Sequence, residues 1–302
     1  PCRRSATARA VTSPPGSSPD DDFHLTSIWC AAGTQDGRCE LVEGAPLQRL
    51  VPARVVDAEK CFAFDGDVSA GCVAGIPDEM VATDRVNATA GLYPPVYYRT
   101  MAFLVGPDVE RSVLVMRLFN AALASVLLAL LIRIVPLGIR RATLIAVAVT
   151  FVPLGLFVVA STNPSGWSLV GLLFYWAFGL SLLHRSNWRN RRTWLIAMAT
   201  VVTGVMAAGS RVDAAAYVVL ASALVLILAG PSRWRRAWAS TAIVVAVTLF
   251  AGITFLVQGT PAGEAETMGS ASRGVGLLLT NAVYLPVLLQ QAVGGGALGW
   301  ND

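Results

Sequence analysis

From about residue 110 onward, apolar stretches separated by short arginine-rich segments dominate the chain. Each stretch is close to the roughly 20 residues that an α-helix needs to cross about 30 Å of hydrocarbon. Charged residues make up only 14% of the chain, against about a quarter in a typical soluble protein. These features predict a polytopic α-helical membrane protein with six spans, near residues 112–132, 142–160, 167–184, 194–208, 214–230 and 237–257.

The arginines alternate between the predicted loops. The loops at 161–166 and 209–213 hold only Arg211. Cytoplasmic loops carry an excess of basic residues, so the other three loops are expected in the cytoplasm and the segment before the spans outside. The chain would then be a multi-pass protein of the plasma membrane with an outer ectodomain. The remaining loops hold ten arginines, namely Arg133, Arg140, Arg141, Arg185, Arg189, Arg191, Arg192, Arg233, Arg235 and Arg236.

The chain divides into three parts on this basis. Residues 1–111 are predicted to be an extracytoplasmic segment, and residues 112–257 the six transmembrane helices. Residues 258–302 are predicted to be an outer loop with a re-entrant or interfacial helix at 275–293, a seventh span being the alternative. We expect the chain to be a fragment at both ends. Its net charge of +4 comes with no aromatic-interleaved basic patch, so no nucleic-acid partner is expected.

Four of the five cysteines lie between the acidic cluster described below and the first predicted span: Cys30, Cys39, Cys61 and Cys72. No Cys-x-x-Cys or Cys/His spacing typical of zinc occurs, so no metal site is assigned to them. An even number of cysteines in one outer segment indicates disulfides. The simplest of the three connectivities joins neighbours, Cys30 to Cys39 and Cys61 to Cys72. Four free buried thiols are the alternative.

Local patterns give a coarse secondary structure for the ectodomain. A short helix is predicted within residues 20–32. The glycine- and proline-rich stretch at 33–90 is predicted to be loops with strand-like pieces at 54–56 and 61–64. The Tyr-Pro-Pro-Val-Tyr-Tyr stretch at 93–98 is predicted to be a stiff segment leading back to the bilayer, because its prolines cannot continue a helix.

An acidic cluster precedes the first predicted helix. Asp20, Asp21 and Asp22 are consecutive, and His24 follows them. One interpretation is a site at the membrane face that meets a charged headgroup. The other is helix capping, since Ser18 or Asp20 suits an N-cap position.

Other candidate polar residues fall in the predicted outer turns. Asn163 and Ser165 either face a ligand or form simple turn contacts. Arg211 lies in a predicted outer loop, where the positive-inside rule disfavours a basic residue. It is expected either to bind phosphate or to pair with Asp213. Arg117, within the first span, is predicted to snorkel to the interface. No phosphate-binding Gly-rich loop and no dinucleotide motif occurs, which disfavours ATP-driven transport and NAD chemistry.

Four short motifs resemble, in order, the landmarks of a bacterial membrane family called domain of unknown function 2142. Pro-Asp-Asp-Asp-Phe-His at 19–24 is similar to its Pro-Asp-Glu-Pro-x-His stretch, and 93–98 to its His-Pro-Pro-Leu-Tyr-Tyr stretch. Asn-Pro-Ser-Gly at 163–166 and Leu-Gly-Trp-Asn-Asp at 298–302 resemble two more. The departures are Asp21 for Glu, Asp22 for Pro and Tyr93 for His, the last of which removes an imidazole.

The family is similar in layout to the GT-C superfamily of membrane glycosyltransferases. The resemblance implies transfer of a sugar from a polyprenyl-phosphate donor to a glycan or lipid acceptor in cell-envelope assembly. It implies catalytic roles for Asp20, Asp21 and His24, and substrate binding by Tyr93, Asn163, Ser165, Arg211 and Asp213. Whether the aspartates hold a divalent metal stays open. A lipid-linked sugar transporter or flippase, or a non-catalytic envelope protein, is the alternative.

Overall fold

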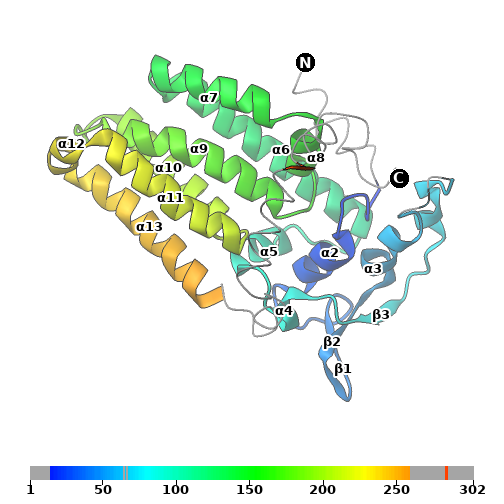
Figure 1. The fold of residues 1–302 in the computed structure, drawn as a ribbon. Helices are drawn as coiled ribbons and strands as arrows, with labels where there is room; N and C mark the ends of the chain where they lie inside the picture. Colours follow the sequence, from blue (N-terminus) through cyan, green and yellow to red (C-terminus); the bar gives the residue numbers. More distant parts are fainter. Residues whose placement is uncertain (1–13, 64, 66, 259–282, 285–302) are drawn as a thin grey trace.

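The computed structural model describes residues 14–63, 65, 67–258 and 283–284, and its helices form a bundle with a smaller α/β region at one end (Figure 1). The predicted helix at 275–293 and the last motif at 298–302 lie outside the described residues, apart from two positions of the former. The elements are α2 (Asp21–Cys30), β1 (Glu40–Val42), β2 (Ala45–Pro52), α3 (Ala53–Lys60), η1 (Ala70–Gly75), β3 (Met80–Thr83), α4 (Asn87–Ala90), α5 (Pro95–Ala102), α6 (Val109–Ile134), α7 (Leu137–Thr150), α8 (Pro153–Val159), α9 (Ser165–Leu183), α10 (Arg191–Ala208), α11 (Val212–Ala229), α12 (Pro231–Arg236) and α13 (Trp238–Gln258).

The region before the bundle consists of short helices around a small antiparallel sheet of order β1-β2-β3. Val42 pairs with Ala45, so Glu43 and Gly44 form the turn, and Gly44 has the positive φ that such a turn requires. The helix predicted within 20–32 is α2, all of whose residues are buried. A helix that is buried on every side is a core element of its region. Each of its side chains therefore needs a packing or hydrogen-bonding partner within the protein.

Two expectations for this region were wrong. Residues 54–56, predicted as a strand piece, lie within α3, which Pro52 precedes at the N-cap. Val55 and Val56 are buried there, so tertiary packing overrode their preference for strands. Residues 61–63 form a turn rather than a strand. The segment at 93–98, predicted to be stiff, leads into α5, which begins at Pro95. Proline suits the first helical position, because the N–H that it lacks would have no partner within the helix there.

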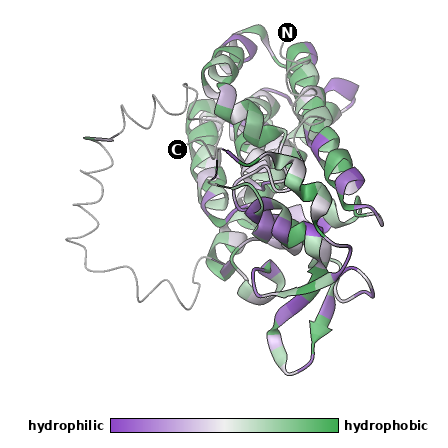
Figure 2. Cartoon of the chain, turned by 90° about the vertical axis from the view of Figure 1, so that its right-hand side faces the viewer, coloured by the Kyte–Doolittle hydropathy of each residue, from purple (hydrophilic) through white to green (hydrophobic). Residues whose placement is uncertain are grey.

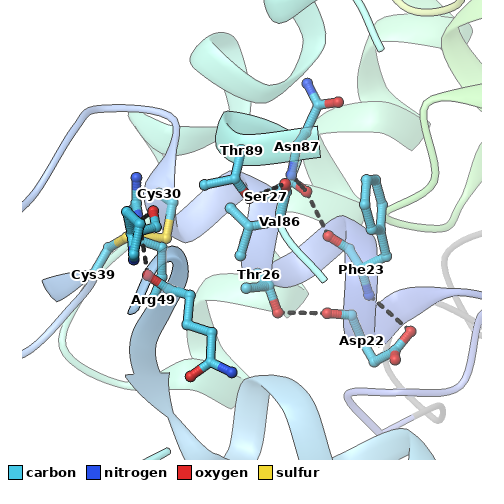
Figure 3. Close-up of a disulfide and its surroundings, with 12 residues drawn as sticks. Asp22, Phe23, Thr26, Ser27, Cys30, Cys39, Arg49, Val86, Asn87 and Thr89 are labelled. Carbon is cyan, nitrogen blue, oxygen red and sulfur yellow. Dashed lines mark hydrogen bonds between the residues drawn. A yellow bond between two sulfur atoms is a disulfide. The ribbon is translucent and has the colours of Figure 1, made fainter. Parts of the chain in front are cut away.

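Both neighbour disulfides are formed. Cys30 joins Cys39 with a Cα–Cα distance of 5.2 Å, and Cys61 joins Cys72 at 6.1 Å. The first ties the end of α2 to the loop before β1 (Figure 3). The second closes the chain between α3 and η1. Each closes a short loop, which in the chain-entropy model stabilises the folded state by about 2.5–3 kcal/mol.

The bundle has two chemically different ends. At one end Arg192 donates to the carbonyl of Ile134 (2.9 Å), and Ser240 donates to the carbonyl of Arg185 (2.8 Å). These contacts bring the three arginine-rich loops together. At the other end Arg211 donates to Ser165 (3.2 Å), and the Gly209 carbonyl accepts from the Tyr97 amide (3.3 Å). That end carries α2 and α5 (Figure 1).

Four helices of the described part are long and apolar enough to span a membrane: α6, α9, α11 and α13. A fifth span arises if α7 and α8 are counted together, although they are bent by 97° at a break before Pro153. The six predicted spans are therefore not confirmed. The predicted second span is broken because proline removes a backbone donor and clashes with the preceding turn. The predicted fourth corresponds to α10, whose first two residues are arginines.

The outer face of the bundle is apolar, as expected for contact with lipid. Large side chains such as Leu220, Ile227 and Leu256 are more than half exposed. Figure 2 shows hydrophobic residues along most bundle helices, while hydrophilic ones are frequent near the sheet. Inside, small residues allow close approach: a Cβ on Gly171 would lie 2.7 Å from the carbonyl oxygen of Thr203. The α9–α10 contact thus depends on a glycine, as is common between membrane helices.

Candidate functional site

Three of the sequence motifs meet at the bundle end that lies opposite the arginine-rich loops. They are the start of α2, the segment that enters α5, and the turn before α9; the turn before α11 with Arg211 joins them. Asn163 donates to the carbonyl of Pro19 (3.4 Å), and Thr162 donates to Asp21 (2.6 Å). The rings of His24 and Tyr93 lie 5.4 Å apart. Segments far apart in sequence therefore build one polar cluster, which we call the acidic site.

Asp21 lies at the centre of the acidic site and is fully buried. Its carboxylate accepts from the Thr162 hydroxyl and from the Ser18 amide (3.1 Å), and lies 3.8 Å from the Arg117 guanidinium. Burial raises the pKa of Asp21 above its ordinary value, while Arg117, Thr162 and Ser18 oppose this. An aspartate that is enclosed and partnered in this way acts first as an anchor between α2, α6 and the turn before α9.

Arg117 was predicted to snorkel to the membrane interface, and that prediction was wrong. Its side chain is 3% exposed and donates to the Pro14 carbonyl and the Ser17 hydroxyl, both at 2.9 Å. Facing protein is the other solution for a charge in a membrane helix. An arginine flanked by apolar residues needs a polar partner, so the sequence did indicate that Arg117 has one. It did not indicate which residue, because Pro14 and Ser17 lie about a hundred residues away in sequence.

Asp22 and Asp20 face a second arginine. Arg85, in the loop after β3, donates to Asp22 Oδ1 (2.9 Å) and lies 3.3 Å from Asp20. Its guanidinium also lies 5.8 Å from the centre of the Phe23 ring. The Asp22 amide donates to Glu59 of α3 (2.8 Å). Arg85 and Glu59 were not singled out from the sequence, because nothing local distinguishes them from the other charged residues before the bundle.

Asp20 is the exposed member of the aspartate triplet, its side chain being 67% accessible. It holds the N-cap position of α2 but makes no capping hydrogen bond with its side chain, and its φ of 59° is left-handed. The capping interpretation therefore fails for Asp20. Its carboxylate is left facing solvent beside Arg85, where a ligand can reach it.

His24 lies in an aromatic cluster behind the aspartates. Its Nδ1 shares a hydrogen bond with the Tyr98 hydroxyl (2.9 Å), and its ring contacts Phe23 and Tyr93. Burial, with Arg211 and Arg85 adding to it, lowers the pKa of His24 to about 3. The imidazole is therefore neutral at physiological pH and forms part of the wall of the site.

Arg211 and Asp213 form the ion pair that was one of the two expectations, with Nε to Oδ1 at 2.9 Å. Arg211 also donates to Ser165, and its guanidinium lies 5.6 Å from the centre of the Tyr93 ring. Burial alone would lower the pKa of Arg211, but Asp213 holds it above the ordinary value. The cation is thus fixed and half-buried, and Asp213 is itself more than half exposed.

Hydrogen bonds behind the site fix its turn and its first helix. Asn163 Oδ1 accepts from the Ser165 amide (2.9 Å), which is the turn contact considered for these residues. Ser27 accepts from the Asn87 amide (2.9 Å) and donates to the Phe23 carbonyl (2.6 Å), as Figure 3 shows. Asn87 in turn exchanges two hydrogen bonds of 2.8 Å with the backbone of Tyr93. The site therefore has a preformed backbone.

The aspartates of the acidic site are arranged for arginine pairing and not as a set of metal ligands. Within the described residues, no three His, Cys, Asp or Glu side chains gather as metal ligands. The two buried aspartates instead face Arg117 and Arg85. Each of these carboxylates is thus already paired with a guanidinium group.

Comparison with known families gives one result that covers nearly the whole chain. The model of a family described as predicted membrane protein, DUF2142, matches residues 6–295. No curated protein and no solved structure matches the chain.

Proposed function

The chain belongs to the DUF2142 family of predicted membrane proteins, and from this premise we propose that it is a GT-C-like glycosyltransferase of the bacterial plasma membrane. It transfers a sugar from a polyprenyl-phosphate donor to a glycan or lipid acceptor at the extracytoplasmic face, in assembly of the cell envelope. The acidic site is the place of this reaction.

The main support for the proposal is the turn before α9. The turn before α9 bridges an exposed carboxylate and a fixed cation, because Asn163 contacts the Pro19 carbonyl next to Asp20 while Ser165 contacts Arg211. Both groups belong to the end of the bundle where candidate spans α6, α9 and α11 begin. A donor anchored in the bilayer would present its phosphate at this level, and an acceptor would approach from water.

The reaction needs a base for the acceptor hydroxyl and a cation for the donor phosphate. Asp20 takes the proton of the acceptor hydroxyl, whose oxygen forms the new bond to the sugar C1. The bond between C1 and the phosphate oxygen breaks, and polyprenyl phosphate leaves with the electron pair. Arg211 binds the donor phosphate and stays paired with it as it leaves, so its contribution falls mainly on donor affinity. Tyr93, held under the guanidinium, offers a ring edge to the sugar, and Ser165, Asn163 and Asp213 fix Arg211 and its turn.

Asp21 and His24 serve as positioning residues in this proposal. Asp21 is enclosed by Arg117, Thr162 and Ser18, so it holds the start of α2 in place. His24 is neutral and bound to Tyr98, so it shapes the aromatic wall.

Orientation in the membrane is the first test. The three arginine-rich loops gather at the end opposite the acidic site, and the positive-inside rule would put that end in the cytoplasm. In a Cys2→Ser background, Ala88→Cys should react with an impermeant thiol reagent in intact cells, while Ser232→Cys should react only after lysis. Both positions are exposed in the folded chain. The reversed pattern would place the site in the cytoplasm and exclude the proposed donor face.

Transfer itself is tested with the protein in membranes. Release of polyprenyl phosphate from a panel of polyprenyl-phosphate hexoses and pentoses should depend on the protein. Arg211→Gln should raise the KM for the donor about 10–100-fold, because a charge-assisted contact to phosphate is worth about 1.5–3 kcal/mol. Arg99→Gln, an exposed arginine of α5, is the matched control and should leave KM unchanged. Movement of the donor across the membrane without release would instead favour the flippase alternative.

A further inference from the structure

Glu59, near the end of α3, contacts the first turn of α2. Its Oε2 accepts the Asp22 amide hydrogen at 2.8 Å. The first amides of a helix have no partner within the helix, so this carboxyl supplies one from another element. We propose that Glu59 is a further positioning residue of the acidic site and a proton-binding group, and that its charge state sets how stably the turn at residues 20–22 is held against α3.

The surroundings of Glu59 hold it in place. A Cβ on Gly16, whose φ is +79°, would lie 2.3 Å from the Glu59 amide nitrogen, so the chain before α2 runs directly over this part of α3. Two residues further on, directly after α3, Cys61 begins the second disulfide. Glu59 itself is only 9% exposed. The side chain therefore has little freedom to turn to water when it is ionised.

The charges that face Glu59 are mostly negative. Asp20, Asp21 and Asp22 lie close enough to act on it from the start of α2, and Arg85 is the nearby cation. On α3 itself, Asp57 and Lys60 pair with each other. Other elements packed against α3 add little: the charged residue of β2, Arg49, donates to the carbonyls of Pro46 and Gln48, while β3 and η1 contain no charged residue.

This environment favours the protonated carboxyl. Burial is the largest influence and the neighbouring aspartates add to it, so the pKa of Glu59 is raised to about 7, against the hydrogen bond from the Asp22 amide. A neutral carboxyl still accepts that amide hydrogen through its carbonyl oxygen. Near neutral pH the site can thus gain or lose one negative charge beside the aspartates that bind Arg85 without losing the contact that positions α2.

The sign of the pH dependence follows from the raised pKa. The folded protein binds the proton more tightly than the unfolded chain, whose glutamate titrates near 4.5. Stability contributed by Glu59 is complete below about pH 4.5 and is lost as the pH rises to about 7. This pH dependence of stability is a folding property of the site and does not require the proposed transfer reaction, so either can fail without the other.

The test is thermal unfolding of the purified full chain in detergent from pH 5 to pH 8. Glu59→Gln keeps an acceptor for the Asp22 amide and cannot ionise. Its Tm should exceed that of the wild type by only about 1–2 °C at pH 5 and by about 3–8 °C at pH 8. Asp57→Asn, an exposed carboxyl on the same helix, is the control and should shift Tm equally at both pH values.

Glu59→Leu separates positioning from charge. It removes the acceptor, so its Tm should lie below that of the wild type even at pH 5, where the wild-type carboxyl is neutral. Parallel Tm curves for Glu59→Gln and the wild type would overturn the proton-binding role. A Glu59→Gln protein that fails to fold would overturn it as well, because the amide mimics the protonated form. A Leu variant as stable as the wild type at pH 5 would overturn the positioning role.

Discussion

Asp21→Asn is expected to lower the free energy of unfolding by about 3–5 kcal/mol, the usual cost of removing one partner of a buried ion pair. Asparagine has nearly the volume of aspartate, but its single oxygen can accept from only one of Thr162 and Ser18, which contact different carboxylate oxygens of Asp21. It cannot neutralise Arg117, whose side chain is 3% exposed. The loss therefore reports the negative charge and the hydrogen-bond acceptor that Asp21 supplies, and not a cavity.

The neighbouring residue supplies a matched control for this prediction. Asp20→Asn changes the same chemical group one residue earlier, where the side chain is 67% exposed, and should alter stability by less than about 0.5 kcal/mol. Thermal unfolding in detergent compares the two. The double change Asp21→Asn with Arg117→Gln should recover part of the loss, because neither member of the pair is then charged. Equal Tm values for the two single variants would show that Asp21 is not the anchor described.

Sequence reasoning succeeded where a local pattern determines the structure. The neighbour disulfides follow from close spacing, and α2 follows from the apolar side that Phe23, Ile28 and Trp29 give to residues 20–32. The motifs at 19–24, 93–98 and 163–166 each turned out to supply residues of the acidic site. Motifs scattered through a helical membrane chain converge readily when they all lie in loops or helix starts at the same end of a bundle.

The failures share one physical cause, which is that partners distant in sequence decided the outcome. Val55 and Val56 became helical because α3 packs on α2 and the sheet. Arg117 is buried because Pro14, Ser17 and Asp21 reach it across the fold. The six predicted spans stay unconfirmed, with four or five candidates among the described helices, because a hydropathy pattern does not reveal the 97° bend between α7 and α8.

Asp20→Asn is expected to lower the rate of sugar transfer by about 10²–10⁴-fold, the usual contribution of a positioned general base. Asparagine adopts the left-handed conformation at φ 59° as readily as aspartate, so the backbone of the turn is kept. Asp22 continues to hold Arg85 through a 2.9 Å hydrogen bond. The only group removed is the exposed proton acceptor.

The kinetic pattern distinguishes this role from its neighbours. Loss of a base should reduce kcat with little change in the KM for the donor, whereas Arg211→Gln should mainly raise that KM. Release of polyprenyl phosphate by equal amounts of folded protein measures both, with Tm as the check on folding. Full turnover by Asp20→Asn would remove Asp20 as the base and leave only enclosed carboxylates in the triplet, since Asp21 and Asp22 are both buried. A transferase would then need its base from another segment, because both of these carboxylates are buried and already paired with an arginine.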